Sequence, residues 1–329
     1  MRILFGTDGS RYARAAAHFL ARWVNAEGGR VDLVTVVPKR PASQGPFKGD
    51  RLGSWERWRG RAARWQDAVE EPLLVRGYRV TRMVRTGDPA DVLVALSRRG
   101  QYDLVVVGAK GRDDGSYFGL GSSALALLDR APQPVLVVRE RDFGYRTRRF
   151  IPSRHGPLPV LLGSDGPPPS RHAVRAFCSL FRSAPVDAEL LAVLEGPEGA
   201  PGRILSPSER ARLQRDSESA IRRRLAPTEN ELRGRQVASA TRILEGHPAT
   251  GLVSRAGASE TEMIVVECRR PSRAPEAGFE TGGMPRALLG EDALEIVRSA
   301  PCSVLRLRDL EHQASMEPWY HLVNRSPLG

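Results

Sequence analysis

The chain has 329 residues, of which 41% are hydrophobic and 27% are charged, and its formal net charge is +12. This length predicts two domains, and the composition excludes wholesale disorder and a fibrous protein. No apolar run approaches the roughly 18 residues of a membrane span. The segment 1–9 is too polar for a signal peptide, so we expect a cytoplasmic protein without a membrane partner.

Short β-branched runs alternate with longer helical patterns through the first half of the chain. The runs predict strands over residues 2–7, 31–37, 79–85, 103–107 and 134–138. Between them, Ser10 is suited to cap a helix that continues to Val24, and Pro89 suits the first turn of a helix that continues to Arg98. Such alternation indicates βαβ units around a buried parallel sheet.

A stripe of aromatic and apolar residues predicts another helix, between the second and third strands. Its members recur at spacings of three and four residues, namely Trp55, Trp58, Ala62, Trp65 and Val69. This spacing places them on one face of a helix. We interpret that face as core-facing rather than as an aromatic platform for nucleic-acid bases.

The second half of the chain repeats motifs of the first half in the same order. Residues 3–9 (ILFGTDG) recur as 160–166 (VLLGSDG), at an offset of 157 residues. Two further pairs of motifs share an offset of 159 and a fourth has an offset of 169: 87–90 with 246–249, 103–107 with 262–266, and 120–125 with 289–294. Four motifs in one order indicate a duplicated domain.

We therefore predict an α/β protein made of two tandem doubly wound domains, each with a five-stranded parallel sheet. The first domain is predicted to span residues 1–138 and the second 159–308. Residues 139–158 mix arginine, glycine, proline and aromatics without periodicity, which is typical of a linker, here a basic one. Residues 309–329 are left as a C-terminal tail.

A motif of glycine and serine follows the fourth predicted strand of the first copy. Gly108, Gly111 and then Gly121, Ser122 and Ser123 have the spacing G-x2-G-x9-G-S-S. Glycines directly after a buried strand let backbone N–H groups approach a phosphate, and the start of the next helix adds free N–H groups and serine hydroxyls. The motif predicts a phosphate-binding loop; the structural alternative is a flexible connection whose glycines only permit turns.

Asp8 follows the first predicted strand and is expected to face this loop. In an open parallel sheet, ligands bind beyond the carboxyl ends of the strands where the winding reverses, which requires Asp8 to face Gly108. Two other nucleotide motifs are excluded. The chain has no GxxxxGK[ST], and residues 119–124 match G-x-G-x-x-A without directly following a strand.

At these residues the chain resembles the universal stress protein family, specifically its tandem-domain members of the ATP-binding kind. The resemblance is close over 1–138 and weaker over 159–308. It implies that the triphosphate and ribose of ATP are held by the loop residues Gly108, Gly111, Gly121, Ser122 and Ser123. It also implies that Asp8 lies near the ribose, the phosphates or a bound Mg²⁺, and that the backbone of Val36 contacts adenine.

The resemblance also implies self-association. Domains of this family pair through their fifth strands, so residues 134–138 and 303–307 are expected to join the two copies into a pseudo-dimer. A homodimer is a further expectation from the same resemblance.

Acidic residues mark two departures from the family pattern. Asp113 and Asp114 lie in the spacer of the loop, where Lys110 and Arg112 offset part of their charge. In the second copy, the positions that match Gly108, Gly111, Ser122 and Ser123 hold Glu267, Arg270, Glu291 and Asp292. Carboxylates that face a polyphosphate repel it, so we predict that the second domain does not bind ATP by this route.

Three functions are compatible with the sequence. The first, which we favour, is a regulatory stress protein that binds an adenine nucleotide in its first domain. The second is a slow ATPase, although no general base and no other catalytic residue can be assigned. The third is a nucleic-acid or partner-binding scaffold, suggested by the net charge of +12 and the arginine-rich segment 143–150. The cysteines and histidines show no metal-ligand spacing, so no metal–protein site is predicted.

Overall fold

The computed structural model describes residues 1–37, 51–111, 119–139, 156–164, 171–194, 206–268 and 291–308. The chain divides into two compact units, Met1–Ser153 and Arg154–Gly329, called the first and the second unit below. No helix among these described residues combines the length and the apolar character that crossing a membrane requires.

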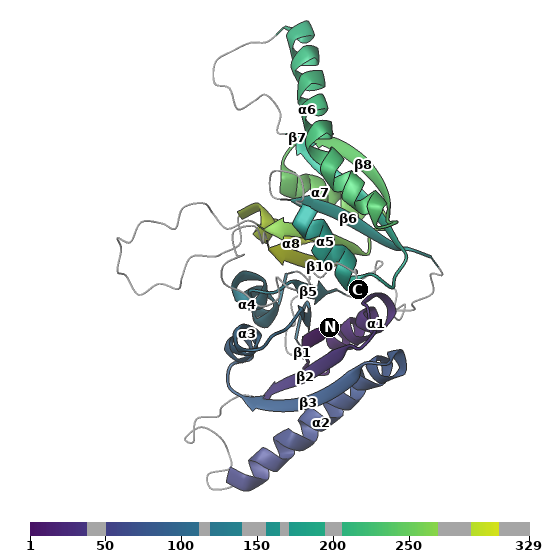
Figure 1. The fold of residues 1–329 in the computed structure, drawn as a ribbon. Coiled ribbons are helices and arrows are strands. Elements are labelled where there is room, and N and C mark those ends of the chain that lie inside the picture. The colour runs from purple at the N-terminus through teal and green to yellow at the C-terminus, as the bar shows by residue number, and fades with distance from the viewer. Residues whose placement is uncertain are drawn as a thin grey trace, which may run out of the picture. The chain divides into compact units, whose positions relative to one another are not determined.

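The first unit is built on parallel strands in the order β3-β2-β1-β4-β5, with helices packed on the sheet (Figure 1). Its elements are β1 (Arg2–Gly6), α1 (Arg11–Trp23), β2 (Arg30–Val37), α2 (Arg51–Arg76), β3 (Arg79–Thr86), α3 (Pro89–Arg99), β4 (Leu104–Gly108), α4 (Ser122–Arg130) and β5 (Val135–Val138). Strand β1 lies between β2 and β4. The winding therefore reverses at β1, which makes this a doubly wound sheet, as predicted.

Two glycines show that helices cover both faces of this sheet. A Cβ on Gly6 would lie 2.8 Å from Leu93 of α3, whereas a Cβ on Gly108 would lie 2.7 Å from Tyr12 of α1. Gly6 is paired with Val107, the neighbour of Gly108, and successive residues of a strand point to opposite faces. Helices α1 and α3 thus lie on opposite faces; α2 packs against α1, and α4 packs against α3.

The two helix starts predicted from the sequence are confirmed. Ser10 caps α1, because its Oγ accepts a hydrogen bond from Ala13 N at 3.2 Å. Pro89 is the first residue of α3, and the cap of that helix is Asp88, whose Oδ1 accepts from Asp91 N at 3.1 Å. Both caps satisfy N–H groups that have no partner within the helix.

The aromatic stripe of α2 faces the core only in part. Ala62 and Val69 are buried, whereas Trp58 and Trp65 are half-buried and contact each other edge to face at 6.3 Å between ring centroids. The side chain of Trp55 lies outside the described residues. The helix therefore has one apolar side that covers the sheet and an aromatic pair near its margin.

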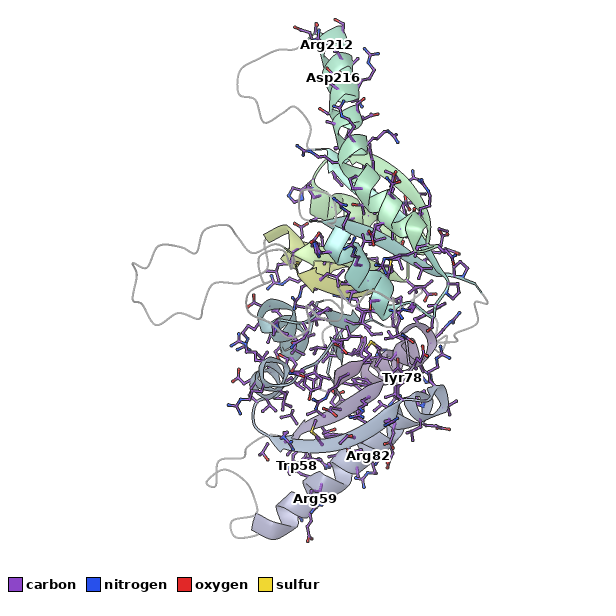
Figure 2. All side chains as sticks on the ribbon, in the orientation of Figure 1. Trp58, Arg59, Tyr78, Arg82, Arg212 and Asp216 are labelled. Carbon is purple, nitrogen blue, oxygen red and sulfur yellow. The ribbon has the colours of Figure 1, made fainter. Side chains whose placement is uncertain are left out.

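Strand β3 is the outermost strand of the first unit, and α2 anchors it. Gln66 of α2 is buried and donates from Nε2 to Met83 O at 3.0 Å and to Leu33 O at 3.3 Å. Arg82 of β3 donates to Asp67 of α2 at 2.7 Å and also to Glu70 (Figure 2). One amide thus links β2 to β3, and an exposed ion-pair cluster fixes the helix across them.

The second unit has the same architecture, with parallel strands in the order β10-β9-β6-β7-β8 (Figure 1). Its elements are β6 (Leu158–Ser164), α5 (Arg171–Leu180), β7 (Val186–Leu194), α6 (Pro207–Gly234), β8 (Ala238–Glu245), α7 (Pro248–Ala258), β9 (Met263–Cys268), α8 (Glu291–Ser299) and β10 (Ser303–Arg308). The predicted fold class, two tandem doubly wound α/β repeats, is thus confirmed.

The strand registers confirm the duplication residue by residue. Leu4 of β1 pairs with Asp32 of β2, and 157 residues later Leu161 of β6 pairs with Glu189 of β7. The packing of the helices repeats as well. A Cβ on Gly163 would lie 2.4 Å from Leu252 of α7, which is the counterpart of the contact between Gly6 and Leu93. We call each of these glycine–leucine pairs a glycine notch.

Asp32 and Glu189, which occupy corresponding positions, are both held by arginine. Asp32 accepts hydrogen bonds from Arg2 Nη2 at 2.6 Å and from Tyr102 OH at 2.8 Å. Glu189 accepts from Arg255 Nη2 at 2.7 Å and from Arg242. Burial opposes ionisation of Glu189, but the two arginines outweigh it and lower the pKa of the carboxyl. Both units therefore keep an ionised carboxylate on their second strand, with partners drawn from different elements.

Candidate functional site

The candidate site lies where β1 and β4 end side by side. Gly6, the last residue of β1, pairs with Val107, and Gly108 follows as the last residue of β4. From β1 the chain winds through β2 to β3 on one side, and it returns to β4 on the other side. The segments after Gly6 and Gly108 thus leave the sheet at the same edge, at its topological switch point.

A tight turn fixes Asp8 at this edge. Ser10 N donates to Asp8 Oδ1 at 2.9 Å, which closes the turn that leads into α1. Gly9 has a φ of +68°, and a Cβ there would lie 2.7 Å from the ring of Trp65 on α2. The backbone of Gly9 is therefore both left-handed and pressed against an aromatic ring, and only glycine satisfies both conditions.

The Asp8 carboxylate faces the glycine motif. A Cβ on Gly111 would lie 3.3 Å from Asp8 Oδ2, so no side chain separates the carboxylate from the backbone of Gly111. Ser10 Oγ donates to Lys110 O at 3.4 Å, which adds a second link between the turn and the segment after β4. The structure thus brings Asp8 and Gly111 together, as the switch-point argument required.

The far end of the motif returns to the same place. Gly121 N donates to Ala109 O at 2.8 Å, and a Cβ on Gly121 would lie 3.5 Å from both Ala109 O and Gly111 N. The two ends of the loop are therefore in contact, although residues 112–118 between them, including Asp113 and Asp114, lie outside the described residues. Asp8, Gly111 and Gly121 form one cluster.

The start of α4 joins this cluster. Gly121 is the cap residue, and within the described part of the chain no side chain caps the helix. Ser122 is exposed and Ser123 is half-buried. Uncapped N–H groups and the positive end of the helix dipole favour an anion there, and two hydroxyls stand beside them.

Gly108 has a different role from the other motif glycines. A Cβ there would lie 2.7 Å from Tyr12 Cβ and 2.8 Å from the carbonyl carbon of Tyr12. The missing side chain therefore makes room for the first turn of α1 rather than for a ligand. This close approach brings α1, its cap Ser10 and the Asp8 turn against β4.

Val36 lies one strand away from this cluster. It is the penultimate residue of β2, is half-buried, and pairs with Arg85 of β3. Thr7 N donates to Val34 O at 2.8 Å, which ties the exit of β1 to β2 two residues before Val36. Val36 is thus at the same edge of the sheet as Asp8, while the contacts above do not connect it with the glycine cluster.

The corresponding position in the second unit carries a buried carboxylate. Gly163 pairs with Val266 and Ser164 with Glu267, so Glu267 occupies the place that Gly108 has in the first unit. Its side chain is only 1% exposed. Glu291 is the first residue of α8; its side chain, that of Asp292 and all of Arg270 lie outside what the structure describes.

Metal ligands do not gather elsewhere in the described residues, where no group of three histidine, cysteine or acidic side chains is close enough to hold an ion. Cys178, Cys268 and Cys302 are buried free thiols. Burial raises the pKa of Cys178 to about 11, so this thiol is neutral near pH 7.

The fold and this edge define a tandem doubly wound α/β protein with a glycine-rich switch-point loop in its first unit. The sequence model of the universal stress protein family matches residues 1–139 and 158–308. The chain therefore belongs to the universal stress protein family, and the two matched regions support a tandem-domain member.

Relatives span all or part of the chain. A universal stress protein of Mycobacterium tuberculosis is 26% identical over 335 aligned positions, which cover 93% of this chain and 94% of the relative. A universal stress protein of Mycolicibacterium smegmatis is 31% identical over 175 positions, and this alignment spans about half of each protein, 52% of this chain and 56% of the relative. The crystal structure of a universal stress protein from Archaeoglobus fulgidus is 14% identical, covers 93% of this chain and 96% of its own, and has a TM-score of 0.56.

Proposed function

We propose that the first unit binds an adenine nucleotide, with ATP as the expected ligand, and that the protein acts as a nucleotide-dependent regulator. The observation that carries this proposal is the convergence of the Asp8 carboxylate, the backbone of Gly111 and the uncapped start of α4 at the switch point. Donors for an anion thus stand opposite a carboxylate that could hold a cation or a ribose hydroxyl.

The residues present fit a polyphosphate that carries a cation. The N–H groups and hydroxyls of Ser122 and Ser123 are suited to donate to phosphate oxygens, and the bare backbone of Gly111 lets a phosphate approach. Asp8 alone would repel a phosphate, so it fits the site as a ligand of Mg²⁺ or as an acceptor from the ribose. ATP would supply the polyphosphate, and the backbone of Val36 would receive the adenine.

We propose that the second unit does not bind ATP at the corresponding place. Glu267, buried where the first unit has Gly108, supports this because an ionised carboxylate near a polyphosphate is repulsive. The acidic residues at the start of α8, Glu291 and Asp292, add negative charge where the first unit offers serine hydroxyls. One nucleotide per chain is therefore expected.

Equilibrium dialysis with labelled ATP tests the proposal directly. We expect about one site per chain in the wild-type protein and at least a tenfold loss of affinity in Gly121→Glu. Gly121 has a φ of −66° and room for a Cβ, so the variant folds, while its carboxylate competes for the helix start and repels the phosphates. Gly60→Glu is the matched control, because a Cβ at Gly60 on α2 meets nothing within 4 Å.

Equal affinity in wild-type protein and Gly121→Glu would contradict the proposed site. Two sites per chain would contradict the assignment of the second unit as inactive.

The role of Asp8 predicts a dependence on Mg²⁺. Asp8→Asn keeps the oxygen that accepts from Ser10 N, so the turn is retained while the negative charge is lost. We expect its affinity for ATP in the presence of Mg²⁺ to fall by about tenfold, on the order of 1.4 kcal/mol. In EDTA the variant should bind ATP at least as tightly as the wild type, since the repulsion is removed. Calorimetric titration under both conditions measures the change, and a loss of equal size in both would rule out a cation at Asp8.

A further inference from the structure

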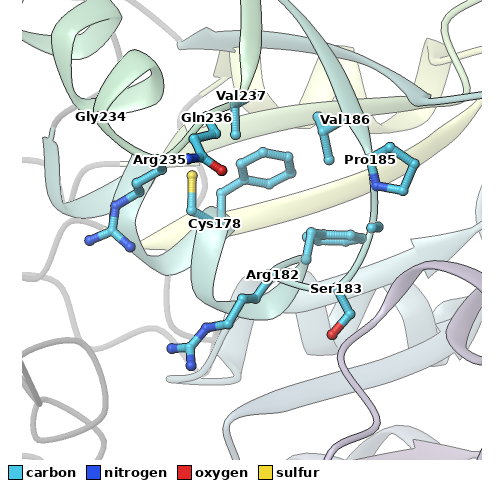
Figure 3. A pocket seen from close by; sticks show the side chains of 12 residues that line it. Cys178, Arg182, Ser183, Pro185, Val186, Gly234, Arg235, Gln236 and Val237 are labelled. Carbon is cyan, nitrogen blue, oxygen red and sulfur yellow. The ribbon is translucent and has the colours of Figure 1, made fainter. Parts of the chain in front are cut away.

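The second unit contains a pocket at the amino edge of its sheet, opposite the edge that corresponds to the proposed nucleotide site. It has a volume of about 540 Å³ and lies between the end of α5, the start of β7, the end of α6 and the start of β8 (Figure 3). Its walls include Phe177, Phe181, Val186 and Val237, and Arg182 and Arg235 lie at its margin. This volume is within the range of small-molecule sites.

The first unit shows what this place contains in the other copy. Tyr78 N donates to Leu73 O at 3.0 Å at the end of α2, and Val237 N donates to Leu232 O at 3.0 Å at the end of α6. The next residues also correspond, since Arg79 pairs with Arg30 while Ala238 pairs with Asp187. Val237 is therefore the counterpart of Tyr78.

In the first unit the phenol ring of Tyr78 fills this corner. Tyr78 is 3% exposed, and its OH donates to Val24 O at 3.0 Å (Figure 2). Its ring lies so close to Gly29 that a Cβ there would be 2.7 Å from it. A ring and its hydroxyl thus seal the first unit where α1 ends.

In the second unit no tyrosine ring comes from this position. The counterpart of Val24 is Phe181, because Val24 N bonds to Leu20 O and Phe181 N bonds to Phe177 O, both at 3.1 Å. The rings of Phe177 and Phe181 stack at 5.0 Å between centroids and recover part of the lost volume. The exchange of tyrosine for valine still leaves a pocket with an aromatic wall.

The margin of the pocket is positively charged. The side chains of Arg182 and Arg235 extend in the same direction from it (Figure 3). Glu231 accepts from Arg235 Nε at 2.9 Å and from Arg175 Nε at 3.0 Å. Three guanidinium groups thus face one carboxylate. Arg182 is exposed and stands free to meet an acidic ligand.

We infer that this pocket binds a small aromatic acid, whose ring takes the place that the Tyr78 ring has in the first unit and whose carboxylate meets Arg182 at the margin. The aromatic wall favours a flat ring through stacked or edge contacts. The neutral thiol of Cys178, also in the lining, adds no charge to the interior. The inference is independent of ATP, because the pocket lies in the other unit.

Calorimetric titration of the full chain with three probes tests this inference. The probes are 4-hydroxyphenylacetate, which has both ring and acid, p-cresol, which has the ring alone, and acetate, which has the acid alone. We expect one site per chain for 4-hydroxyphenylacetate, at least fivefold weaker binding of p-cresol and no measurable binding of acetate. Equal affinity for acetate and 4-hydroxyphenylacetate would overturn the inference.

Two variants locate the site. Val237→Tyr restores the residue of the first unit and is expected to abolish binding of 4-hydroxyphenylacetate. Arg182→Gln, an exposed change that leaves the fold intact, should weaken 4-hydroxyphenylacetate about fivefold and leave p-cresol unchanged. Arg233→Gln is the matched control, because Arg233 is exposed on α6 and outside the pocket lining.

Unchanged binding of the acid in Arg182→Gln, or an equal loss in Arg233→Gln, would contradict the inference even if Val237→Tyr fails to fold. Gly121→Glu separates the two proposed sites, since it should lose ATP and keep 4-hydroxyphenylacetate.

Discussion

Gly108→Ala is expected to lower the free energy of unfolding of the first unit by about 3 kcal/mol. The new methyl group would lie 2.7 Å from Tyr12 Cβ, 2.8 Å from the Tyr12 carbonyl carbon and 3.0 Å from Ala13 N. Two of these atoms belong to the backbone of α1, so no change of rotamer relieves the contact and the helix has to move away from β4. Urea unfolding followed by circular dichroism measures the loss.

The same displacement should reach the proposed nucleotide site. The cap of α1, Ser10, holds Asp8 through its N–H and contacts Lys110 through its hydroxyl. We therefore expect ATP affinity to fall together with stability in Gly108→Ala. Gly121→Ala is the matched control for the unfolding experiment, because its Cβ would make ordinary contacts at 3.5 Å and should change stability by less than about 0.5 kcal/mol. Equal unfolding midpoints for the two variants would refute the packing role of Gly108.

Gly163→Ala is expected to destabilise the second unit by about 2 kcal/mol, because it fills a glycine notch. The added Cβ would lie 2.4 Å from Leu252 Cδ2 and 2.7 Å from Cδ1. Here the obstacle is the end of a side chain, so shortening it should relieve the clash. Leu252→Ala alone should cost about 3 kcal/mol through the cavity it leaves. The double variant should be more stable than the sum of the two losses by about 2 kcal/mol, as measured in a double-mutant cycle.

Gly257→Ala supplies the matched control for this cycle. Gly257 is exposed on α7, and a Cβ there meets nothing within 4 Å. The same substitution should therefore raise stability by about 0.5–1 kcal/mol, since alanine favours a helix over glycine. Strict additivity of Gly163→Ala and Leu252→Ala would show that the two residues do not share one contact.

The architecture was predictable because the duplicated motifs coincide with strand ends. Residues 3–9 and 160–166 each contain the exit from the middle strand of their sheet, and this exit tolerates few residue types. The glycine of each notch lies inside this motif. Its constraint comes from a helix that follows two strands later, and it is visible in the sequence only as a glycine that occurs twice.

The individual roles within the site were less predictable. Gly108 and Gly111 look alike in a G-x2-G motif, yet one makes room for α1 and the other leaves the Asp8 carboxylate uncovered. The sequence signal for both is the same, because glycine records that a side chain is excluded and not which neighbour excludes it. The difference needs the position of α1, which no local pattern encodes.

The pocket of the second unit and the two buried carboxylates were not predicted from the sequence. Tyr78 and Val237 lie outside the four repeated motifs, and only the strand registers show that they correspond. Asp32 and Glu189 correspond as well, but their arginine partners come from unrelated positions, Arg2 in one unit and Arg255 in the other. A search for repeated letters does not detect a position whose chemistry is kept through different neighbours.

The glycine notches also limit how either unit can move. The methyl groups of Leu93 and Leu252 lie where a strand side chain would otherwise be, so each seats its helix at one position along the sheet. Sliding α3 or α7 by a helical turn would drive these methyls into neighbouring residues that do carry a Cβ. We therefore expect any motion that accompanies nucleotide binding to arise between Gly108 and Gly121, with α3 acting as a fixed support.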